Sequence, residues 1–383
     1  MPPVYLDNAA STRVSEPVLA IMTEVMRSAW GNPSSQHPQG AAARAHLETA
    51  RRRLLAALGD PTGDGQLGDI VWTSGCTEAD ALAVLGAARI RAGSIVVSSI
   101  EHAAVGALAA RLGESRTAIF VEPGRDGVLD PAAVARAAPG AAVVSIVMVQ
   151  NEIGAIQPVA AIARAVRAVN PACHLHVDAA QAFGKLAIDV RALGVDSIAI
   201  AGHKVHGPKG IGALWLRTGV ALEPLWVGGG QQGGLRGGTQ DAPSAAGFGL
   251  AAEHAAAELP AIRARWLALA ARVTAQLRDR GVAFHQLVPD PLRSPHILAL
   301  GITGVPAGAL RTVLASRGVY ISTGSACAER DGHGKPSPVL LAIGVPPDTG
   351  MCRLSFSHDT SEGDVDLGAG ALADVALELR RGS

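Results

Sequence analysis

Short apolar strands alternate with helical segments through the first two-thirds of the 383-residue chain. Runs rich in Val, Ile and Trp predict seven strands, at residues 69–73, 94–99, 118–122, 142–149, 173–177, 197–201 and 212–216. Helical patterns lie between them, at residues 77–91, 105–112, 131–138 and 158–169. This alternation predicts an α/β fold whose mostly parallel, seven-stranded sheet is covered by helices on both faces. Ligands of such sheets bind at the carboxyl ends of the strands, so functional residues are expected there.

The order of elements changes in the last third of the chain. A Gly-rich stretch over 224–244 is followed by an Ala-rich helix over 243–280, in which Pro260 predicts a break because proline has no backbone N–H. From Pro295 onward the pattern is that of a mixed α+β unit. We therefore expect two domains, a large one at 15–255 and a smaller α+β one formed by 1–14 and 256–383.

Charge and hydropathy exclude several classes of protein. The 33 basic and 33 acidic residues balance, so we expect no direct binding to nucleic acid. The apolar run at 140–150 is too short to cross a bilayer, and residues 1–8 lack the basic and apolar regions of a secretory signal. We therefore expect a cytoplasmic protein that does not contact the membrane, and its 48% of hydrophobic residues is enough for a sizeable core.

Lysine and cysteine are scarce enough to limit the chemistry. Any reaction that needs a side-chain amine must use one of four lysines, which are Lys185, Lys204, Lys209 and Lys335. The cysteines have no paired spacing, so no disulfide framework is expected. They are Cys76, Cys173, Cys327 and Cys352.

Two neighbouring predicted strands end in residues that suit a cofactor. Asp178 follows the strand at 173–177, on the same face as His176, and a helix cap or a core salt bridge is its alternative role. Lys204 follows the strand at 197–201, and its alternative is an ordinary surface lysine. An acid and an amine at adjacent strand ends are what pyridoxal 5'-phosphate (PLP) requires. The amine forms the Schiff base, and the acid keeps the pyridine nitrogen protonated.

Two competing interpretations fit the sequence less well. Lys209 is the other candidate amine, but its Gly-Pro-Lys-Gly segment fits a turn that holds the backbone. A metal site formed by Cys173, His174 and His176 would need successive strand residues to point to one side, whereas they alternate. No metal is therefore expected.

The segment 73–79 fits a phosphate site. A strand, a Gly turn and the first turn of a helix follow one another, with Thr77 and free backbone N–H groups at the helix N-terminus. Simple helix capping is the alternative, because Ser and Thr favour this position anyway.

Cys327 is the candidate reactive thiol. It lies among Ser, Thr and Gly, ahead of a loop whose Arg330, His333 and Lys335 favour the thiolate, and a solvent-exposed bystander is the alternative. Cys173 and Cys352 lie in or beside apolar segments and are expected to be structural. Cys76 begins a helix, where a thiol pKa can fall, but we interpret it mainly as part of the cofactor loop.

Nine segments in order resemble the signatures of cysteine desulfurases, which are class V aminotransferases of the type I PLP fold. The resemblance extends from about residue 4 to about residue 365. It points to the subgroup of iron–sulfur and nitrogenase-associated enzymes, and among these to the branch that serves DNA phosphorothioation. The segments are Tyr5–Thr12, Gly31–His37, Thr73–Glu78, Glu101–Val105, Asn151–Gly154, His176–Gln181, His203–Lys204, Arg236–Thr239 and Ser322–Cys327.

The resemblance implies a conversion of L-cysteine to L-alanine with a persulfide left on Cys327. Lys204 would bind the cofactor and move protons, and His102 would stack on its ring. The other cofactor contacts would come from Asp178 at the pyridine nitrogen, Gln181 at the ring hydroxyl, Asn151, and Cys76, Thr77 and His203 at the phosphate. Thr239 would reach the phosphate of the neighbouring subunit, which implies a homodimer. Substrate would be bound by Arg353, Asn151 and Asn32, and the guanidinium fork of arginine matches a carboxylate.

The sequence is also compatible with other functions. Selenocysteine lyase, another PLP-dependent lyase or an aminotransferase on the same fold would share most of these residues, although transamination needs no thiol. A non-catalytic sulfur-assembly scaffold would not need the combination of Lys204, Asp178 and Cys327. The dinucleotide-binding string at 228–233 is followed by Gly-Leu-Arg-Gly-Gly-Thr where a helix should begin.

The sulfur acceptor is not encoded in these motifs. We expect an acceptor protein of the iron–sulfur, thiolation or DNA-phosphorothioation machinery. The sequence also departs from the family pattern, with Ala201 and Gly237 in place of a usual Ser, Gln232 in place of a usual Glu, and Ala79-Asp80 in a stretch that normally ends in Asn. Ala201 removes one expected phosphate contact.

Overall fold

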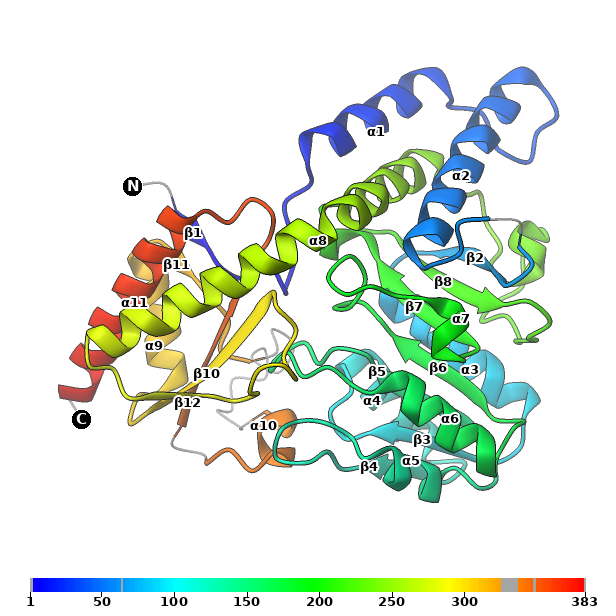
Figure 1. Cartoon of the computed structure of the whole chain (residues 1–383). Helices are drawn as coiled ribbons and strands as arrows, with labels where there is room; N and C mark the ends of the chain where they lie inside the picture. The colour runs from blue at the N-terminus through cyan, green and yellow to red at the C-terminus, as the bar shows by residue number, and fades with distance from the viewer. Residues whose placement is uncertain (1–2, 63–64, 325–336, 347–348, 382–383) are drawn as a thin grey trace.

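A seven-stranded sheet forms the centre of the larger part of the molecule (Figure 1). The structure, a computed structural model, describes residues 3–62, 65–324, 337–346 and 349–381. All strands run parallel except β8, which is antiparallel to both neighbours. The predicted strands and the mostly parallel sheet are confirmed. In spatial order the strands are β2 (Gly68–Thr73), β8 (Gly212–Arg217), β7 (Ser197–Ala201), β6 (His174–Asp178), β5 (Ala141–Val147), β3 (Ser94–Ser98) and β4 (Ala118–Val121).

Helices cover both faces of this sheet, as the alternating pattern predicts. One face packs against α3 (Cys76–Ile90) and α4 (Ala103–Leu112) in a continuous apolar cluster. The other face packs against several helices in a second apolar cluster. Residues of α7 (Val190–Leu193) and α1 (Glu16–Ser28) also belong to this cluster. Those helices are α2 (Pro38–Ala57), α5 (Pro131–Ala137), α6 (Val159–Val169) and the first half of α8 (Ala242–Asp279).

A smaller α+β part packs around the second half of α8 (Figure 1). Its three-stranded antiparallel sheet has the order β12-β10-β9, and the short strands β1 and β11 pair parallel beside it. This part has its own apolar core against α8 and α11. The division into domains at residue 255 stays a prediction. The elements are β1 (Val4–Tyr5), β9 (Phe284–Gln286), β10 (Ile297–Thr303), α9 (Ala307–Ser316), β11 (Val319–Tyr320), α10 (Pro338–Ala342), β12 (Thr349–Ser355) and α11 (Glu362–Arg381).

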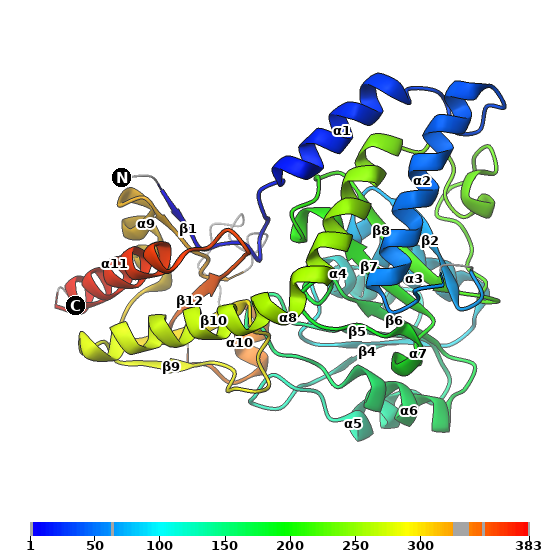
Figure 2. The same ribbon diagram turned by 45° about the horizontal axis from the view of Figure 1, so that its top comes forward.

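The predicted break at Pro260 is wrong. Helix α8 continues through this residue and connects the two parts of the molecule, with a bend that is clear in Figure 2. Pro260 and Ala256, whose carbonyl loses its usual N–H partner, are both exposed, so water can replace the missing hydrogen bond. Packing of α8 against α2 on one side and α11 on the other then outweighs the local cost of the proline.

Among the helices that the structure describes, none combines the length and the apolar character needed to span a membrane.

Candidate active site

One cavity of about 470 Å³ lies at the carboxyl ends of the central strands, where a parallel sheet places its ligands. Its walls come from the ends of β5 and β6, the turn after β7, the start of α3 and strand β12. The fold thereby brings together residues that are far apart in the sequence. Nine of the residues predicted from the sequence line this cavity: Cys76, Thr77, His102, Asn151, Asp178, Gln181, His203, Lys204 and Arg353.

Asp178 is the last residue of β6 and is buried at the floor of the cavity. Its Oδ1 accepts a hydrogen bond from the backbone N–H of Ala180 at 2.9 Å. The same oxygen lies 3.5 Å from the Sγ of Cys76, which can donate its thiol proton to it. These contacts fix the orientation of a carboxyl group that faces the cavity.

Lys204 lies in the turn directly after β7 and also lines the cavity. Its Nζ donates to the backbone carbonyl oxygens of Ala9 and Ala10, at 2.7 and 2.9 Å. Burial, and then the positive charge of Arg353, lower the pKa of this amine to about 8. A buried amine with such a pKa loses its proton readily and can act as a nucleophile. Lys209, the competing lysine, is exposed at the edge of the cavity.

The N-terminus of α3 forms another wall. Cys76 and Thr77 are its first residues, so their backbone N–H groups have no partner within the helix. A Cβ on Gly212 would lie 2.6 Å from the backbone of Gly75, so glycine is needed to bring this turn so close to the sheet. Burial and the nearby lysines lower the pKa of His203 to about 4, which leaves its ring neutral at this wall.

His102 lies at the N-cap of α4, where its Nδ1 accepts a hydrogen bond from the backbone N–H of Ala104 at 3.2 Å. The neutral ring therefore carries its proton on Nε2. Burial lowers the pKa of His102, and the charge of Asp178 opposes this effect. The result is a neutral aromatic ring at the cavity, which suits stacking on a planar ligand.

Arg353 extends from β12 into the cavity and is already paired there. Its Nη2 lies 2.6 Å from the Oδ1 of Asp7, and its Nη1 donates to the backbone carbonyl of Asn151 at 2.7 Å. These bonds tie β12 both to the N-terminal segment and to the loop after β5. The sequence predicted Arg353 and Asn151 at the substrate, but gave no role to Asp7.

The N-terminal segment contributes further contacts that sequence reasoning missed. The carbonyl of Ala9 accepts a second hydrogen bond, from Nε2 of Gln181 at 2.7 Å, and Ser11 lies 3.3 Å from the ring of His203. The other side-chain atom of Gln181, Oε1, is 3.2 Å from Nε2 of His296. The motif Tyr5–Thr12 was the available signal, because it was part of the resemblance without an assigned role.

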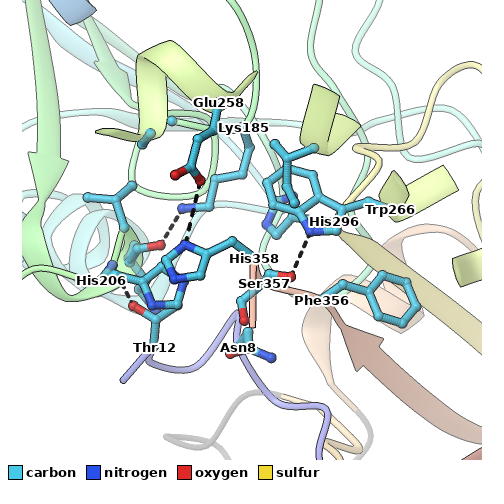
Figure 3. Close-up of a pocket in the computed structure, with 15 residues that line it drawn as sticks. Asn8, Thr12, Lys185, His206, Glu258, Trp266, His296, Phe356, Ser357 and His358 are labelled. Atoms are coloured by element: carbon cyan, nitrogen blue, oxygen red, sulfur yellow. Dashed lines mark hydrogen bonds and ion pairs between the residues drawn. The ribbon is translucent and has the colours of Figure 1, made fainter. Parts of the chain in front are cut away.

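Sequence reasoning also gave no role to Lys185, which contacts the backbone of Lys204 on the side away from the main cavity. A second, much smaller cavity of about 30 Å³ lies on that side (Figure 3). The Nζ of Lys185 donates to the backbone carbonyls of Lys204 and Phe183, and burial lowers its pKa to about 7. In Figure 3, the stacked rings of His206 and His358 lie beside it, with centroids 3.7 Å apart.

The described cysteines differ in part from expectation. Cys173 and Cys352 are buried and burial raises the pKa of both to about 12, in keeping with structural roles. The helix start does not lower the pKa of the Cys76 thiol, because burial, with the nearby carboxyl groups of Asp178 and Asp80, raises this pKa well above its usual value. These effects outweigh the helix N-terminus. Cys327 lies outside the described residues.

Asn32 and Thr239 are not brought into this cavity. They line a separate surface hollow of about 390 Å³, next to Trp30, whose exposed fraction is 70%. Asn32 accepts a hydrogen bond from the backbone N–H of Ser34 at 2.9 Å. Among the described residues that line the cavity around Lys204, neither Asn32 nor Thr239 is found.

The Gly-rich stretch does not form a dinucleotide-binding turn. After the string at 228–233, the next α-helix begins at Ala242. Gln232 instead holds the stretch against β2, since its Oε1 accepts from the backbone N–H of Trp72 at 2.6 Å and its Nε2 donates to the carbonyl of the same residue at 3.1 Å. The stretch is thus an ordered connection, fixed by one of the residues that depart from the family pattern.

A mostly parallel α/β sheet with a lysine amine and a carboxyl group at neighbouring strand ends defines an α/β enzyme with a lysine-centred site. The chain belongs to the class V aminotransferase family, whose model matches residues 4–367. It is 37% identical to a cysteine desulfurase of Gluconacetobacter diazotrophicus, over 98% of this chain and 94% of that protein. It is 36% identical to a selenocysteine lyase of Bos taurus, over 95% and 91% of the two chains.

Solved structures show the same architecture. A NifS-like protein superposes with a TM-score of 0.90 at 31% identity, covering 98% of this chain and all of that one. DndA from Streptomyces lividans superposes with a TM-score of 0.73 at 34% identity, covering 92% and 99%.

Proposed function

We propose that this protein is a PLP-dependent cysteine desulfurase, which converts L-cysteine to L-alanine and keeps the sulfur as a persulfide on Cys327. The observation that carries the proposal is the shared cavity of Lys204 and Asp178, closed on one side by the N-terminus of α3. The similarity to proteins named cysteine desulfurase along nearly the whole chain supports it.

The residues of the cavity fit PLP. A Cβ built on Gly75 meets no atom within 4 Å, so open space lies beside the free N–H groups of α3, where a phosphate is favoured. When bound, PLP supplies an electron sink that stabilises a carbanion at the substrate Cα. Lys204 would hold the aldehyde carbon of the cofactor, and Asp178 its protonated pyridine nitrogen. The remaining contacts would come from Gln181 at the ring hydroxyl, His102 against the ring face, and Cys76, Thr77 and His203 at the phosphate.

The substrate would be oriented by its carboxylate. Arg353 is buried and held by Asp7 and the carbonyl of Asn151, so its fork is preorganised for two carboxylate oxygens. Lys204, with its lowered pKa, would take the Cα proton and return it during the reaction.

Cys327 would accept the sulfur atom. One cysteine and the Cys327 thiol give one alanine and the Cys327 persulfide, so that atoms balance without an added oxidant. Selenocysteine lyase is the second candidate, favoured by the relative of that name. A comparison of L-cysteine and L-selenocysteine as substrates separates the two.

We propose a homodimer in which Asn32 and Thr239 serve the cavity of the partner subunit. Both lie on one face outside the cavity of their own chain, beside the exposed Trp30. Trp226 and Val227 are also exposed, at 47% and 89%, and large apolar side chains of this kind are typical of interfaces.

The sulfur would pass to an acceptor protein in the cytoplasm. The resemblance of the sequence to the branch that serves DNA phosphorothioation supports that machinery as the acceptor, with iron–sulfur assembly and thiolation as alternatives. The balanced net charge supports access to nucleic acid only through such partners.

The test is the release of alanine and sulfide from L-cysteine in the presence of a reductant. Wild type should form both products and show the absorbance of bound PLP, whereas Lys204→Ala should lose both. Lys209→Ala is the matched control, because this lysine lies at the exposed edge of the same cavity, and it should keep the cofactor. Equal product formation by wild type and Lys204→Ala would refute the proposal.

A further inference from the structure

A second buried carboxyl group lies close to Asp178. Asp80 is in the second turn of α3 and its exposed fraction is 1%. Its Oδ1 lies 4.0 Å from the Sγ of Cys76, and that same sulfur lies 3.5 Å from Oδ1 of Asp178. One thiol therefore separates two buried acids, and sequence analysis gave Asp80 no role.

The surroundings of Asp80 are those of a neutral acid. Its Oδ1 is 3.0 Å from Nε2 of His176, whereas its Oδ2 has no hydrogen-bond partner among the described residues. Burial lowers the pKa of His176 to about 3, so this ring is neutral and offers no positive charge. Within the described part of the chain, no Lys or Arg forms an ion pair with Asp80. An ionised carboxylate whose described hydrogen-bond partners are only a neutral imidazole and a thiol would be costly in such a buried site.

The hydrogen-bond chain behind His176 is also uncharged. Nδ1 of His176 and Nε2 of His174 each lie 2.8 Å from the hydroxyl oxygen of Ser197, and all three residues are buried. Burial lowers the pKa of His174 well below its usual value. The chain can therefore orient Asp80 through His176 but cannot neutralise a negative charge there.

The other groups that face Asp80 are acids. Glu101, from the segment between β3 and α4, is buried and raises the pKa of Asp80 together with Asp178. Burial raises the pKa of Glu101 itself to about 8. The charged residues described on the remaining elements packed against α3 are paired elsewhere: Asp69 with Arg51, Arg111 with Glu114, and Arg217 with Asp196.

We propose that Asp80 and Asp178 share a single proton, with Asp80 as the carboxylic acid and Asp178 as the carboxylate. Carboxylate oxygens of the two residues lie within 4.8 Å of each other, and two carboxylates at this separation in a buried site cannot both be ionised without a large cost. The negative charge is better stabilised on Asp178 than on Asp80. Asp178 accepts a hydrogen bond from the backbone N–H of Ala180, and its charge interacts favourably with that of Lys204. Asp80 is then a positioning residue that confines the one negative charge to Asp178.

The consequence for the cofactor rests on the proposed function. With Asp80 neutral, the charge lies on the carboxyl group that would face the pyridine nitrogen. Cys76 lies between the two acids with its pKa raised, so its thiol keeps its proton and can donate it to Asp178 as a hydrogen bond.

Thermal unfolding of the full-length protein as purified, from pH 4 to pH 8, tests the proton without depending on catalysis. In the unfolded chain Asp80 loses its proton near pH 4, whereas the folded protein retains it. Stability due to this group therefore falls as pH rises above 4. Asp80→Asn removes the penalty and keeps the shape of the side chain. Its melting temperature should equal that of wild type at pH 4 and exceed it by about 2 °C or more at pH 8.

Asp196→Asn is the matched control, and the opposite change in melting temperature is expected for it. Asp196 is a buried aspartate that pairs with Arg167 and Arg217, so its charge is compensated and its loss should lower the melting temperature at pH 8. A loss of stability in Asp80→Asn like that in Asp196→Asn would overturn the proposal, because Asp80 would then be an ionised, stabilising group.

A double-mutant cycle tests the sharing of the proton. In the Asp178→Asn background the neighbouring charge is gone, so the gain from Asp80→Asn at pH 8 should shrink. An equal gain in both backgrounds would show that burial alone protonates Asp80 and would refute the pair. If Asp80→Asn does not fold, the infrared band of a protonated carboxyl group decides. Wild type should retain at pH 7 a band that remains in Glu101→Gln, and its absence there would refute the proposal.

Discussion

The ion pair between Asp7 and Arg353 should determine both local stability and the charge state of Lys204. The guanidinium is buried, and its Nη2 lies 2.6 Å from Asp7, whose side chain is 23% exposed. Asp7→Asn removes the charge but keeps an acceptor oxygen. Removing one partner of a buried pair costs about 3–5 kcal/mol. Because Asp7 is partly exposed and the Asn151 carbonyl remains, we expect a loss of about 2–3 kcal/mol here.

The two members of this ion pair have opposite effects on the pKa of the Lys204 amine. The charge of Arg353 lowers the pKa of the Lys204 amine, and the charge of Asp7 raises it. Asp7→Asn should therefore lower this pKa below about 8, and Arg353→Gln should raise it. The neutral amine is the form that can bind the aldehyde of PLP, so the pH midpoint of the reconstitution rate should move down in the first variant and up in the second.

Urea unfolding and the rate of PLP binding to the cofactor-free protein measure these two effects. Asp374→Asn is the control, because its pair with Arg280 is exposed and should contribute only about 0–1 kcal/mol. An Asp7→Asn variant no less stable than the control would show that the pair does not stabilise the fold. Midpoints of Asp7→Asn and Arg353→Gln that move in the same direction would show that the pair does not set the charge of Lys204.

Three further predictions concern the cofactor, the dimer and the buried lysine. Ala201→Ser should retain PLP better than wild type on dialysis, since it restores a hydroxyl near the phosphate, and equal retention would count against this contact. Trp30→Glu should give a monomer by sedimentation that also loses activity, whereas an active dimer would exclude this face as the interface. Lys185 has a folded-state pKa of about 7 against 10.5 in the unfolded chain, so the unfolded state binds more protons between these values and stability from this group rises with pH. Lys185→Met should lack that rise between pH 7 and pH 10, and unchanged pH dependence would contradict the burial of the charge.

The sheet and the cavity were predictable because they follow from regular patterns. Strand alternation and length identify the parallel strands, and the geometry of a parallel sheet then brings their carboxyl ends together. Asp178 and Lys204 meet at one cavity for this reason. The wall at the start of α3, where we propose that the phosphate binds, follows similarly from the Gly turn before this helix.

The misses arise from contacts that no local pattern encodes. Asp7 pairs with a residue 346 positions away, and Lys185 contacts the backbone of Lys204 from behind through a turn. The raised pKa of Cys76 depends on its burial, on Asp178 from β6 and on Asp80 one turn further along α3, none of which a helix-start argument includes. At Pro260 the local rule failed because packing on both sides keeps α8 intact.

The proposed reaction ends with the transfer of sulfur to Cys327. The most direct measurement is mass spectrometry of the protein after it reacts with one equivalent of L-cysteine without reductant. We expect a gain of one sulfur atom on the peptide that contains Cys327 and an equal amount of alanine, with neither in Cys327→Ser. Alanine formed equally by wild type and Cys327→Ser, with no sulfur on Cys327, would contradict this expectation.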